Sequence, residues 1–372
     1  MKKLFIFLCM KIILDNIIYS KSKNGGISNY WFELSKYLMS ETSNDLRFVE
    51  EKKELLNFHR KQLDITTDKI IYKDNPILLF NRLLPIEYNS NEKFIYHSSF
   101  YRKLIGSKKH IEITTVHDFT HDFYAPFVNK KIHNWLKYNA IKRSKGVICI
   151  SQNTYTDLKR FCPTNKNQKV EVIYNGVSDD YFPIKNYSFE DELFLNNFKI
   201  NDEFLLYVGS RTNYKNFDFV TRLINEVKNY KLVVVGGGGF SNREAKLFTQ
   251  NTLKNRIVHI ESVTNSELNI LYNKAHAFIY PSNYEGFGIP IIEAMRAGCP
   301  VVAFDNTINQ EITENKALLL KNLSTRDFLE KMEQLSNVNF RNELIGKGFE
   351  LSKKYSWYKC CKETNEFYES LY

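Results

Sequence analysis

The sequence lacks the marks of several protein classes. Its six cysteines form no C-x-x-C pair and have no histidine at ligand spacing, which argues against a zinc site and a disulfide framework. No helix-turn-helix, zinc-finger or RNP-type signature occurs, so nucleic acid has only the net charge in its favour. No run of about 18 uncharged apolar residues occurs, so we expect no membrane-spanning helix. These absences favour a protein of the reducing cytoplasm that binds no nucleic acid and no metal.

The first residues, MKKLFIFLCM, resemble the start of a signal sequence. Lys11 interrupts the apolar run, and no small-residue cleavage site follows, so we do not expect secretion. Met10 begins a strand of its own. Residues 1–9 are therefore expected to add little to the fold.

The chain is long and basic. Its 372 residues exceed one compact core and are most easily divided into two domains, and its formal net charge of +10 implies an anionic partner. The basic segment 129–146, NKKIHNWLKYNAIKRSKG, carries Ile132, Trp135, Leu136 and Ile141 partly at helical spacing. Such a helix either lies on a membrane surface or packs on the core with its lysines in solvent, and we favour the second interpretation.

Short apolar runs alternate with helical patterns from end to end, which is typical of parallel βαβ construction. The expected strands are 11–19, 93–99, 111–118, 146–151 and 170–176 in the first half, and 204–210, 231–237, 257–262, 277–282 and 299–305 in the second. We therefore expect an α/β fold of two doubly wound, Rossmann-like domains that face a cleft. The expected boundaries are an N-terminal domain 1–183, a linker 184–200, a C-terminal domain 201–354 and a closing helix 355–372.

The segment 283–300, NYEGFGIPIIEAMRAGCP, predicts an anion site at a helix start. Pro290 is typical of a first helical turn, so Gly286-Phe287-Gly288 lies just before the helix. Backbone N–H groups and the positive end of the helix dipole converge there. Glu285 and Glu293 would repel a bare phosphate, so we expect them to accept hydrogen bonds from hydroxyls of attached groups. A nucleotide sugar has hydroxyls on both sides of a diphosphate.

Two cations follow another strand of the same half. Taken singly, a Gly-x-Gly step is a common turn, and Arg211 or Lys215 would be a surface residue. Because all these groups follow strand ends, where ligands of parallel sheets bind, we expect them to hold a diphosphate together. Replacing either cation by alanine is expected to lower turnover far more than stability.

Three segments, GSRTNYKNFDFVTRLI, SVTNSELNILYNKAHAFIYPSNYEGFGIPIIEAMRAGCPVVAFD and VIYNGVSDDYF, resemble the retaining glycosyltransferases of family GT4, which have the GT-B fold. Within that family the chain is most similar to mannosyltransferase-like members that build bacterial surface polysaccharides such as O-antigen. The resemblance extends from GGISNYW to YSWYKCCKETNEFYESLY, and the E-x7-E element is its most specific part. It also implies that the closing helix crosses back to the N-terminal domain.

The resemblance implies a role for each site residue. Glu285 approaches the hydroxyls of the donor sugar, and Glu293 grips the ribose. Arg211 and Lys215 hold the diphosphate, and His117 contacts the donor sugar. Sugar and phosphate are held by the backbone of two loops, formed by Gly25 and Gly26 and by Gly286, Phe287, Gly288 and Ile289. Of these residues, we expect His117, Arg211, Lys215 and Glu285 to be catalytic.

The implied reaction moves a hexose or deoxyhexose from a nucleoside diphosphate to a hydroxyl with retention. No cofactor is implied besides the donor, and a GDP-linked donor is favoured over a UDP-linked one. The expected acceptor is a glycan or lipid-linked oligosaccharide, which would suit peripheral contact with the anionic inner face of the cytoplasmic membrane. A front-face route and a carboxylate nucleophile remain open. Two other functions also remain: a nucleotide-sugar epimerase or hydrolase of the same fold, and a non-catalytic polyanion-binding protein.

Three further features have structural interpretations. Asp179-Asp180 resembles a metal pair, but adjacent residues on an extended chain point apart, so we expect a solvated loop. The glycines 236–239 lack a glycine at 241 to complete a dinucleotide fingerprint, so we expect a strand-to-helix turn near the phosphates. Thr264 and Glu267 are spaced as a capping box.

Overall fold

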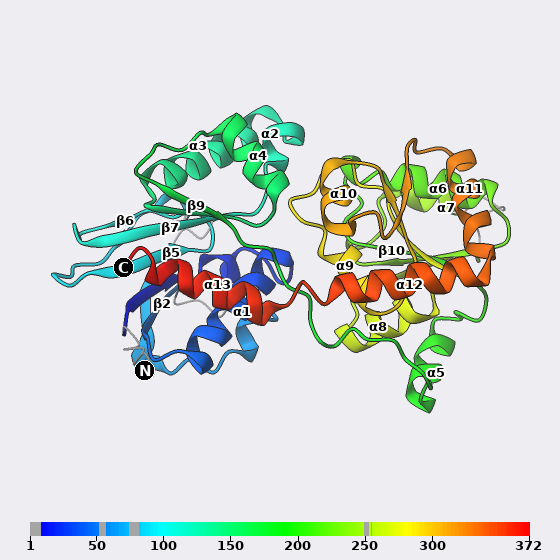
Figure 1. Cartoon of the computed structure of the whole chain (residues 1–372), viewed down its shortest axis with the longest axis horizontal. Coiled ribbons are helices and arrows are strands. Elements are labelled where there is room, and N and C mark those ends of the chain that lie inside the picture. Colours follow the sequence, from blue (N-terminus) through cyan, green and yellow to red (C-terminus); the bar gives the residue numbers. More distant parts are fainter. Residues whose placement is uncertain (1–8, 52–56, 74–81, 249–252, 254) are drawn as a thin grey trace, which may run out of the picture. The chain divides into compact units, whose positions relative to one another are not determined.

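The computed structural model describes residues 9–51, 57–73, 82–248, 253 and 255–372, so residues 1–8, expected to add little, lie outside the described part. It forms two compact units (Figure 1). Unit 1 comprises Met1–Gly176 and Ser356–Tyr372, and unit 2 comprises Val177–Tyr355. The expected linker 184–200 belongs to unit 2 and contains helix α5, Phe189–Asn197. Ser188 and Asp191 form a reciprocal capping box at the start of this helix. The helix was not predicted because the segment is rich in charged residues.

Unit 1 contains a parallel sheet of the order β3-β2-β1-β5-β7-β8-β9. Its strands are β1 Lys11–Asp15, β2 Asp45–Glu51, β3 Ile70–Lys73, β5 Phe94–Ser98, β7 His110–Val116, β8 Gly146–Cys149 and β9 Lys169–Val172, and a separate small sheet pairs β4 Ile86–Glu87 with β6 Leu104–Ile105. The expected strand 11–19 was too long. It ends at Asp15, and a 3₁₀ helix, Ile17–Ser20, buries the rest of the apolar run.

Helices cover this sheet: α1 Gly26–Glu41, α2 Thr120–Tyr124, α3 Phe127–Arg143, α4 Gln152–Phe161 and α13 Trp357–Glu369, with short 3₁₀ turns at Arg60–Gln62 and Thr67–Lys69. The final helix α13 packs beside α1 (Figure 1), where the rings of Tyr37 and Tyr358 lie 5.5 Å apart. Tyr368 of α13 contacts His97 of β5 at 2.6 Å. Gly176 leaves room for this helix, because a Cβ there would lie 2.1 Å from the backbone nitrogen of Trp357.

Unit 2 contains a parallel sheet of the order β12-β11-β10-β13-β14-β15. Its strands are β10 Phe204–Val208, β11 Lys231–Val235, β12 Ile257–Ile260, β13 Ala277–Tyr280, β14 Val301–Phe304 and β15 Leu318–Leu320. Numbered within the unit, this is the Rossmann order 3-2-1-4-5-6. The order reverses between β10 and β13, and ligands of such sheets bind beyond the strand ends at that reversal.

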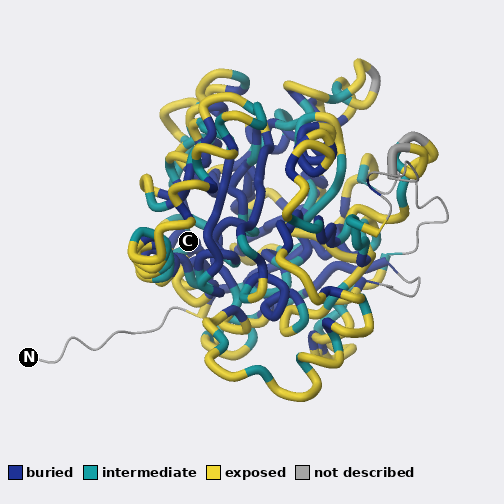
Figure 2. The backbone as a smooth tube through the Cα atoms, turned by 90° about the vertical axis from the view of Figure 1, so that its right-hand side faces the viewer, coloured by how far each residue is buried: buried dark blue, intermediate teal, exposed yellow. Residues whose placement is uncertain are grey.

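The remaining helices of unit 2 flank the sheet: α6 Phe217–Glu226, α7 Asn242–Phe248, α8 Asn265–Lys274, α9 Ile289–Arg296, α10 Thr307–Thr313, α11 Thr325–Ser336 and α12 Val338–Ser352, with a 3₁₀ turn at Asn213–Lys215. The strands form the buried interior and carry its core, which includes Leu205, Val234 and Ile279 (Figure 2). In the described part of the chain, no helix combines the length and the apolar composition needed to cross a membrane.

Candidate active site

Helix α9 starts where the sequence predicts it to start, after the loop that follows β13. Gly288 is its N-cap and has a φ of 96°, a left-handed conformation that favours glycine, and Pro290 stands in the first turn. The Phe287 side chain is buried against Tyr355, with ring centroids 5.6 Å apart. Phe287 can therefore contribute to a ligand site through its backbone but not through its ring.

Lys215 and Glu285 meet at the reversal between β10 and β13. The Lys215 Nζ lies 2.8 Å from the Glu285 Oε1, and each side chain is 15% exposed. Asn216, with a left-handed φ of 52°, donates to the Pro281 carbonyl at 2.8 Å and to the Asn283 side chain at 2.7 Å. These bonds connect the loop after β10 to the loop after β13. Because Lys215 neutralises Glu285, the glutamate opposes a neighbouring phosphate less than it would alone.

Arg211 lies in the same loop as Lys215 but has different partners. Its Nε donates to Glu244 at 2.7 Å, and its terminal nitrogens donate to the carbonyls of Gly236 at 2.9 Å and of Gly238 and Gly239 at 2.8 Å each. These bonds engage four of the five N–H donors of a guanidinium. The guanidinium therefore holds the loop of glycines 236–239 in place.

Glu244 holds Arg211 in this position, and the sequence analysis did not identify it as a site residue. Burial opposes its ionisation, but hydrogen bonds from Ser241 and Arg211 outweigh that effect and hold the pKa of Glu244 below its ordinary value. Ser241 and Glu244 bond reciprocally at the start of α7. The spacing S-x-x-E is a capping-box signal, so the sequence did contain a cue for this residue.

Glu293 lies inside α9 and contacts the neighbouring helix α8, which begins with the predicted capping box of Thr264 and Glu267. The Tyr272 hydroxyl donates to Glu293 Oε2 at 3.1 Å. Burial raises the pKa of Glu293 to about 7, although hydrogen bonds from Tyr272 and Tyr181 act in the opposite direction. The carboxyl group thus titrates near neutral pH. No sequence signal pointed to Tyr272, because its contact depends on the packing of two helices.

Gly25, Gly26 and His117 belong to unit 1, whereas the other predicted site residues belong to unit 2. Gly25 is the N-cap of α1, and both glycines are exposed. His117 directly follows β7, is 8% exposed and lies edge-on to Tyr30 with ring centroids 5.1 Å apart. Burial lowers the pKa of His117 to about 4, against the charge of Asp118. His117 is therefore neutral at neutral pH and can offer a hydrogen bond but not a positive charge.

The adjacent residues Asp179 and Asp180 have separate partners. Asp179 pairs with Arg296 at 2.9 Å, whereas Asp180 accepts from Ser178 and Asn265 at 2.8 Å each. Among the described residues, no group of three or more His, Cys, Asp or Glu side chains is arranged to hold a metal ion.

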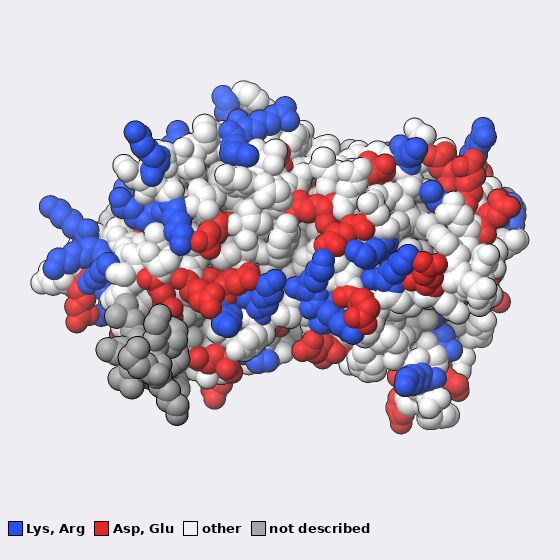
Figure 3. Space-filling view, viewed as in Figure 1, with Lys and Arg blue, Asp and Glu red and all other residues white. Residues whose placement is uncertain are grey.

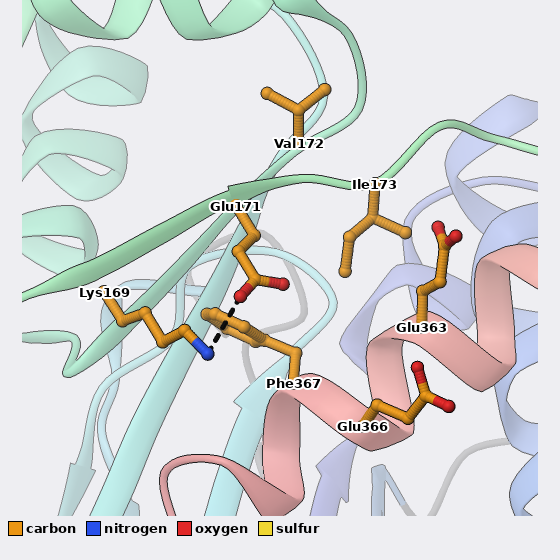
Figure 4. A pocket seen from close by; sticks show the side chains of 7 residues that line it. All are labelled: Lys169, Glu171, Val172, Ile173, Glu363, Glu366 and Phe367. Carbon is orange, nitrogen blue, oxygen red and sulfur yellow. Dashed lines mark ion pairs between the residues drawn. The ribbon is translucent and has the colours of Figure 1, made fainter.

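A pocket of about 420 Å³ lies in unit 1 between β9 and α13 (Figure 4). Its lining residues are Lys169, Glu171, Val172, Ile173, Glu363, Glu366 and Phe367. The one lysine is already paired with Glu171 at 2.8 Å, so the lining has an excess of carboxylates. Such a pocket repels a diphosphate, and the site residues described above take no part in it.

Comparison with known proteins assigns the chain to a family. Residues 188–350 match the family model "Glycosyl transferases group 1", and residues 94–181 match "Glycosyltransferase Family 4". The O-antigen chain mannosyltransferase RfbU of Salmonella typhimurium is 29% identical over 249 residues, which are 64% of this chain and 66% of that protein. The O-antigen chain mannosyltransferase B of Escherichia coli is 26% identical over 296 residues, 75% of this chain and 74% of that protein.

Solved structures agree on the fold. Sucrose-phosphate synthase from Thermosynechococcus elongatus superposes with a TM-score of 0.73 at 16% identity and covers 97% of this chain and 99% of its own. Anabaena HepE, solved with UDP and glucose, gives 0.71 at 15% identity and covers 97% and 100%. Both units thus have Rossmann topology, and the neighbours have the GT-B fold. The chain belongs to the GT-B glycosyltransferases of group 1 and family 4.

Proposed function

We propose that the protein transfers a mannose-like sugar from a nucleoside diphosphate to a hydroxyl of a growing surface glycan. The observation that carries this proposal is the meeting of Lys215, Glu285 and the start of α9 at the reversal of strand order in unit 2. The similarity to two proteins named O-antigen chain mannosyltransferases supports the choice of sugar and of glycan.

Catalysis would depend on stabilising the departing diphosphate, because negative charge grows on that group as the sugar leaves. Lys215 supplies a positive charge. The backbone amides of 286–289, at the N-terminus of α9, supply aligned dipoles. Arg211 would act partly through the glycine loop that it holds.

The carboxylates and the unit 1 residues would bind sugar groups. Glu285 would accept from hydroxyls of the donor sugar, and Glu293 from the ribose. His117, neutral because it is buried, would offer a hydrogen bond to the donor sugar, and the loop of Gly25 and Gly26 would complete the donor contacts. These roles follow the family resemblance and each can be tested by substitution.

For retention we propose the front-face route, in which the departing phosphate takes the proton of the acceptor hydroxyl. The ion pair between Lys215 and Glu285 supports this choice, since a carboxylate held by a lysine is a weaker nucleophile. Mass spectrometry of a trapped reaction tests it. A glycosylated Glu285 or Asp118 would show a covalent intermediate and overturn the front-face route.

We propose a GDP-linked donor and, as acceptor, a lipid-linked oligosaccharide at the inner face of the cytoplasmic membrane. The donor is tested by thermal unfolding with GDP, UDP and dTDP sugars. A ligand at a hundred times its Kd adds about 2.7 kcal/mol of stability to the folded state. The largest shift with GDP sugars supports this donor, a larger shift with UDP sugars replaces it, and no shift with any nucleotide overturns the proposed function.

A further inference from the structure

Unit 1 contains buried polar atoms whose hydrogen-bonding capacity is unused. The Asn175 Oδ1 and the Trp357 Nε1 have no hydrogen-bond partner among the described residues. Asn175 is 3% exposed and Trp357 is 6% exposed. Buried polar atoms of folded proteins nearly always have a partner, because an atom left without one costs stability. One reason to retain such an atom is a ligand that supplies the missing partner.

Helix α13, which begins with Trp357, otherwise satisfies its polar groups. Thr364, on the buried side of the helix, donates to a carbonyl one turn earlier at 2.8 Å. Asn365 accepts from Asn44 at 3.0 Å and donates to Glu369 at 2.8 Å. Figure 3 shows acidic and basic side chains along the outward side of this helix, at the place where Figure 1 labels α13. The Trp357 indole departs from this pattern, since it is buried and polar but not bonded.

The two unbonded groups lie where ligands of a parallel sheet bind. Asn175 follows strand β9 by three residues, at the carboxyl edge of the sheet in unit 1. A Cβ at Gly176 would lie 2.1 Å from the backbone nitrogen of Trp357, so this loop touches the start of α13. The Trp357 ring lies 6.3 Å from the ring of Tyr30, and the Tyr30 ring lies 5.1 Å from His117 at the end of β7. Both groups are therefore neighbours of the histidine that is proposed to contact the donor sugar.

We propose that Asn175 and Trp357 bind hydroxyl groups of a sugar substrate. A carboxamide oxygen only accepts a hydrogen bond, and an indole N–H only donates one. A hydroxyl does both, so a sugar can satisfy the two atoms, whereas neither atom carries a charge that would favour a phosphate. The transferred sugar and the acceptor glycan both carry such groups, and the experiments below distinguish them. This inference rests on the proposed function and deepens it, because it assigns two substrate contacts to unit 1 besides His117 and the glycine loop.

The melting temperature of the ligand-free protein tests whether the amide of Asn175 is unbonded. Asn175→Leu and Asn175→Ala remove a polar group without breaking a hydrogen bond of its oxygen, so we expect little change or a rise. Asn365→Leu and Asn365→Ala are the matched controls and should lower the melting temperature, because they break two hydrogen bonds. Equal decreases at the two positions with both substituents would show that Asn175 has a partner in solution and would overturn the inference.

Calorimetry with GDP and with GDP-mannose measures the contacts of the transferred sugar. Loss of one neutral hydrogen bond weakens binding about three- to tenfold. We expect Asn175→Leu and Trp357→Phe each to weaken the binding of GDP-mannose by this factor and to leave the binding of GDP unchanged. Trp31→Phe is the control, because the Trp31 indole already donates to Asn16 at 2.7 Å, and it should not change the affinity for the sugar.

A conservative variant separates binding from a structural role. Asn175→Asp keeps an oxygen that accepts a hydrogen bond, so it should bind GDP-mannose more tightly than Asn175→Leu does. Its melting temperature should nevertheless be lower, because a buried carboxyl group without a charged partner costs stability. A purely structural asparagine predicts the same order of the two variants in both measurements, and that result would overturn the inference.

The transfer reaction shows which substrate carries the bound hydroxyl. If it belongs to the acceptor, the affinity for GDP-mannose stays unchanged, and the KM for octyl α-mannoside in transfer from GDP-mannose rises about three- to tenfold instead. If Asn175→Leu and Trp357→Phe change neither quantity, the subsite is overturned while GDP binding leaves the proposed function standing. If the unaltered protein binds neither GDP nor GDP-mannose, the proposed function fails and the subsite fails with it.

Discussion

Replacing Lys215 by alanine tests the proposed diphosphate site most directly. The substitution removes a cation that lies 2.8 Å from Glu285 and leaves that glutamate, 15% exposed, without its ion-pair partner. Loss of one preorganised group that stabilises a leaving group raises the barrier by about 3 kcal/mol, which lowers kcat roughly a hundredfold. The unpaired carboxylate then repels the donor diphosphate, so the donor KM is also expected to rise.

A second substitution separates the two effects. Glu285→Gln removes the repelling charge, so in the Lys215→Ala background it should restore much of the nucleotide affinity while kcat stays low. The assay is initial-rate kinetics of sugar transfer, with nucleotide affinity measured by calorimetry. Lys347→Ala is the matched control, because Lys347 forms an exposed ion pair with Glu343 within helix α12.

The reasoning fails if purified Lys215→Ala keeps a kcat within about threefold of the unaltered protein. Loss of a group that contacts the leaving phosphate should lower kcat by much more than that. It also fails if Glu285→Gln does not change nucleotide affinity in the Lys215→Ala background. The stability change is expected to be smaller than the effect on the barrier, about 1 to 2 kcal/mol, because each side chain is 15% exposed and water can partly solvate the remaining carboxylate. A denaturant titration distinguishes this result from general unfolding.

Three further perturbations can be tested, two at glycines and one at Glu293. Gly237→Ala places a Cβ 2.5 Å from Arg211 Nη1 at a φ of 77°, so we expect a lower melting temperature and lower turnover. Gly346→Ala is the control. It lies in helix α12, nothing is within 4 Å of its new Cβ, and it should be neutral or stabilising. Gly176→Ala places a Cβ 2.1 Å from the Trp357 backbone and should reduce the free energy of unfolding by about 1 to 3 kcal/mol in urea titrations, with Gly346→Ala again as the control. Protonation of Glu293, whose pKa is about 7, should weaken nucleotide binding about tenfold from pH 8 to pH 6, and Glu293→Gln should bind weakly at both. The folded-state pKa of Glu293 lies above its ordinary value of 4.5, so its contribution to stability should be lost as pH rises from 4.5 to 7. Unfolding measured against pH should show this loss in the unaltered protein and not in Glu293→Gln.

Much of the fold could be predicted because its signals are local. Each expected strand overlaps an observed one, and α9 begins within a residue of the predicted proline. Strand β2 was not predicted, because its sequence lacks such a signal. Strand β2, DLRFVEE, ends in two buried glutamates whose charges are balanced by Arg60 and Arg102 from distant parts of the chain. Buried charge of this kind cannot be recognised in a sequence, because the partner that permits it is known only after folding.

The contacts of single residues in the candidate site could not be predicted from the sequence either. The sequence predicted that Arg211 and Lys215 follow the strand that the structure identifies as β10. It also predicted that both bind the diphosphate, because it contains no information on their neighbours. The structure gives them different surroundings: Lys215 contacts Glu285, whereas Arg211 contacts Glu244 and three glycine carbonyls. We therefore expect Arg211→Ala to disturb stability as well as turnover, whereas the prediction for Lys215→Ala is unchanged.

The two cations are consequently distinguishable by one comparison. Arg211→Ala removes one donor from each of three loop carbonyls and from Glu244, although the Gly236 carbonyl keeps its contact with His259 at 3.1 Å and Glu244 keeps the bonds from Ser241. A group left without a partner away from water costs about 1 to 3 kcal/mol. Solvent can replace part of this loss, because the loop bonds to Gly238 and Gly239 are exposed. We expect Arg211→Ala to lower the melting temperature and turnover together, and Lys215→Ala to lower mainly turnover. Equal effects of the two variants on both quantities would show that the guanidinium does not hold the glycine loop in solution.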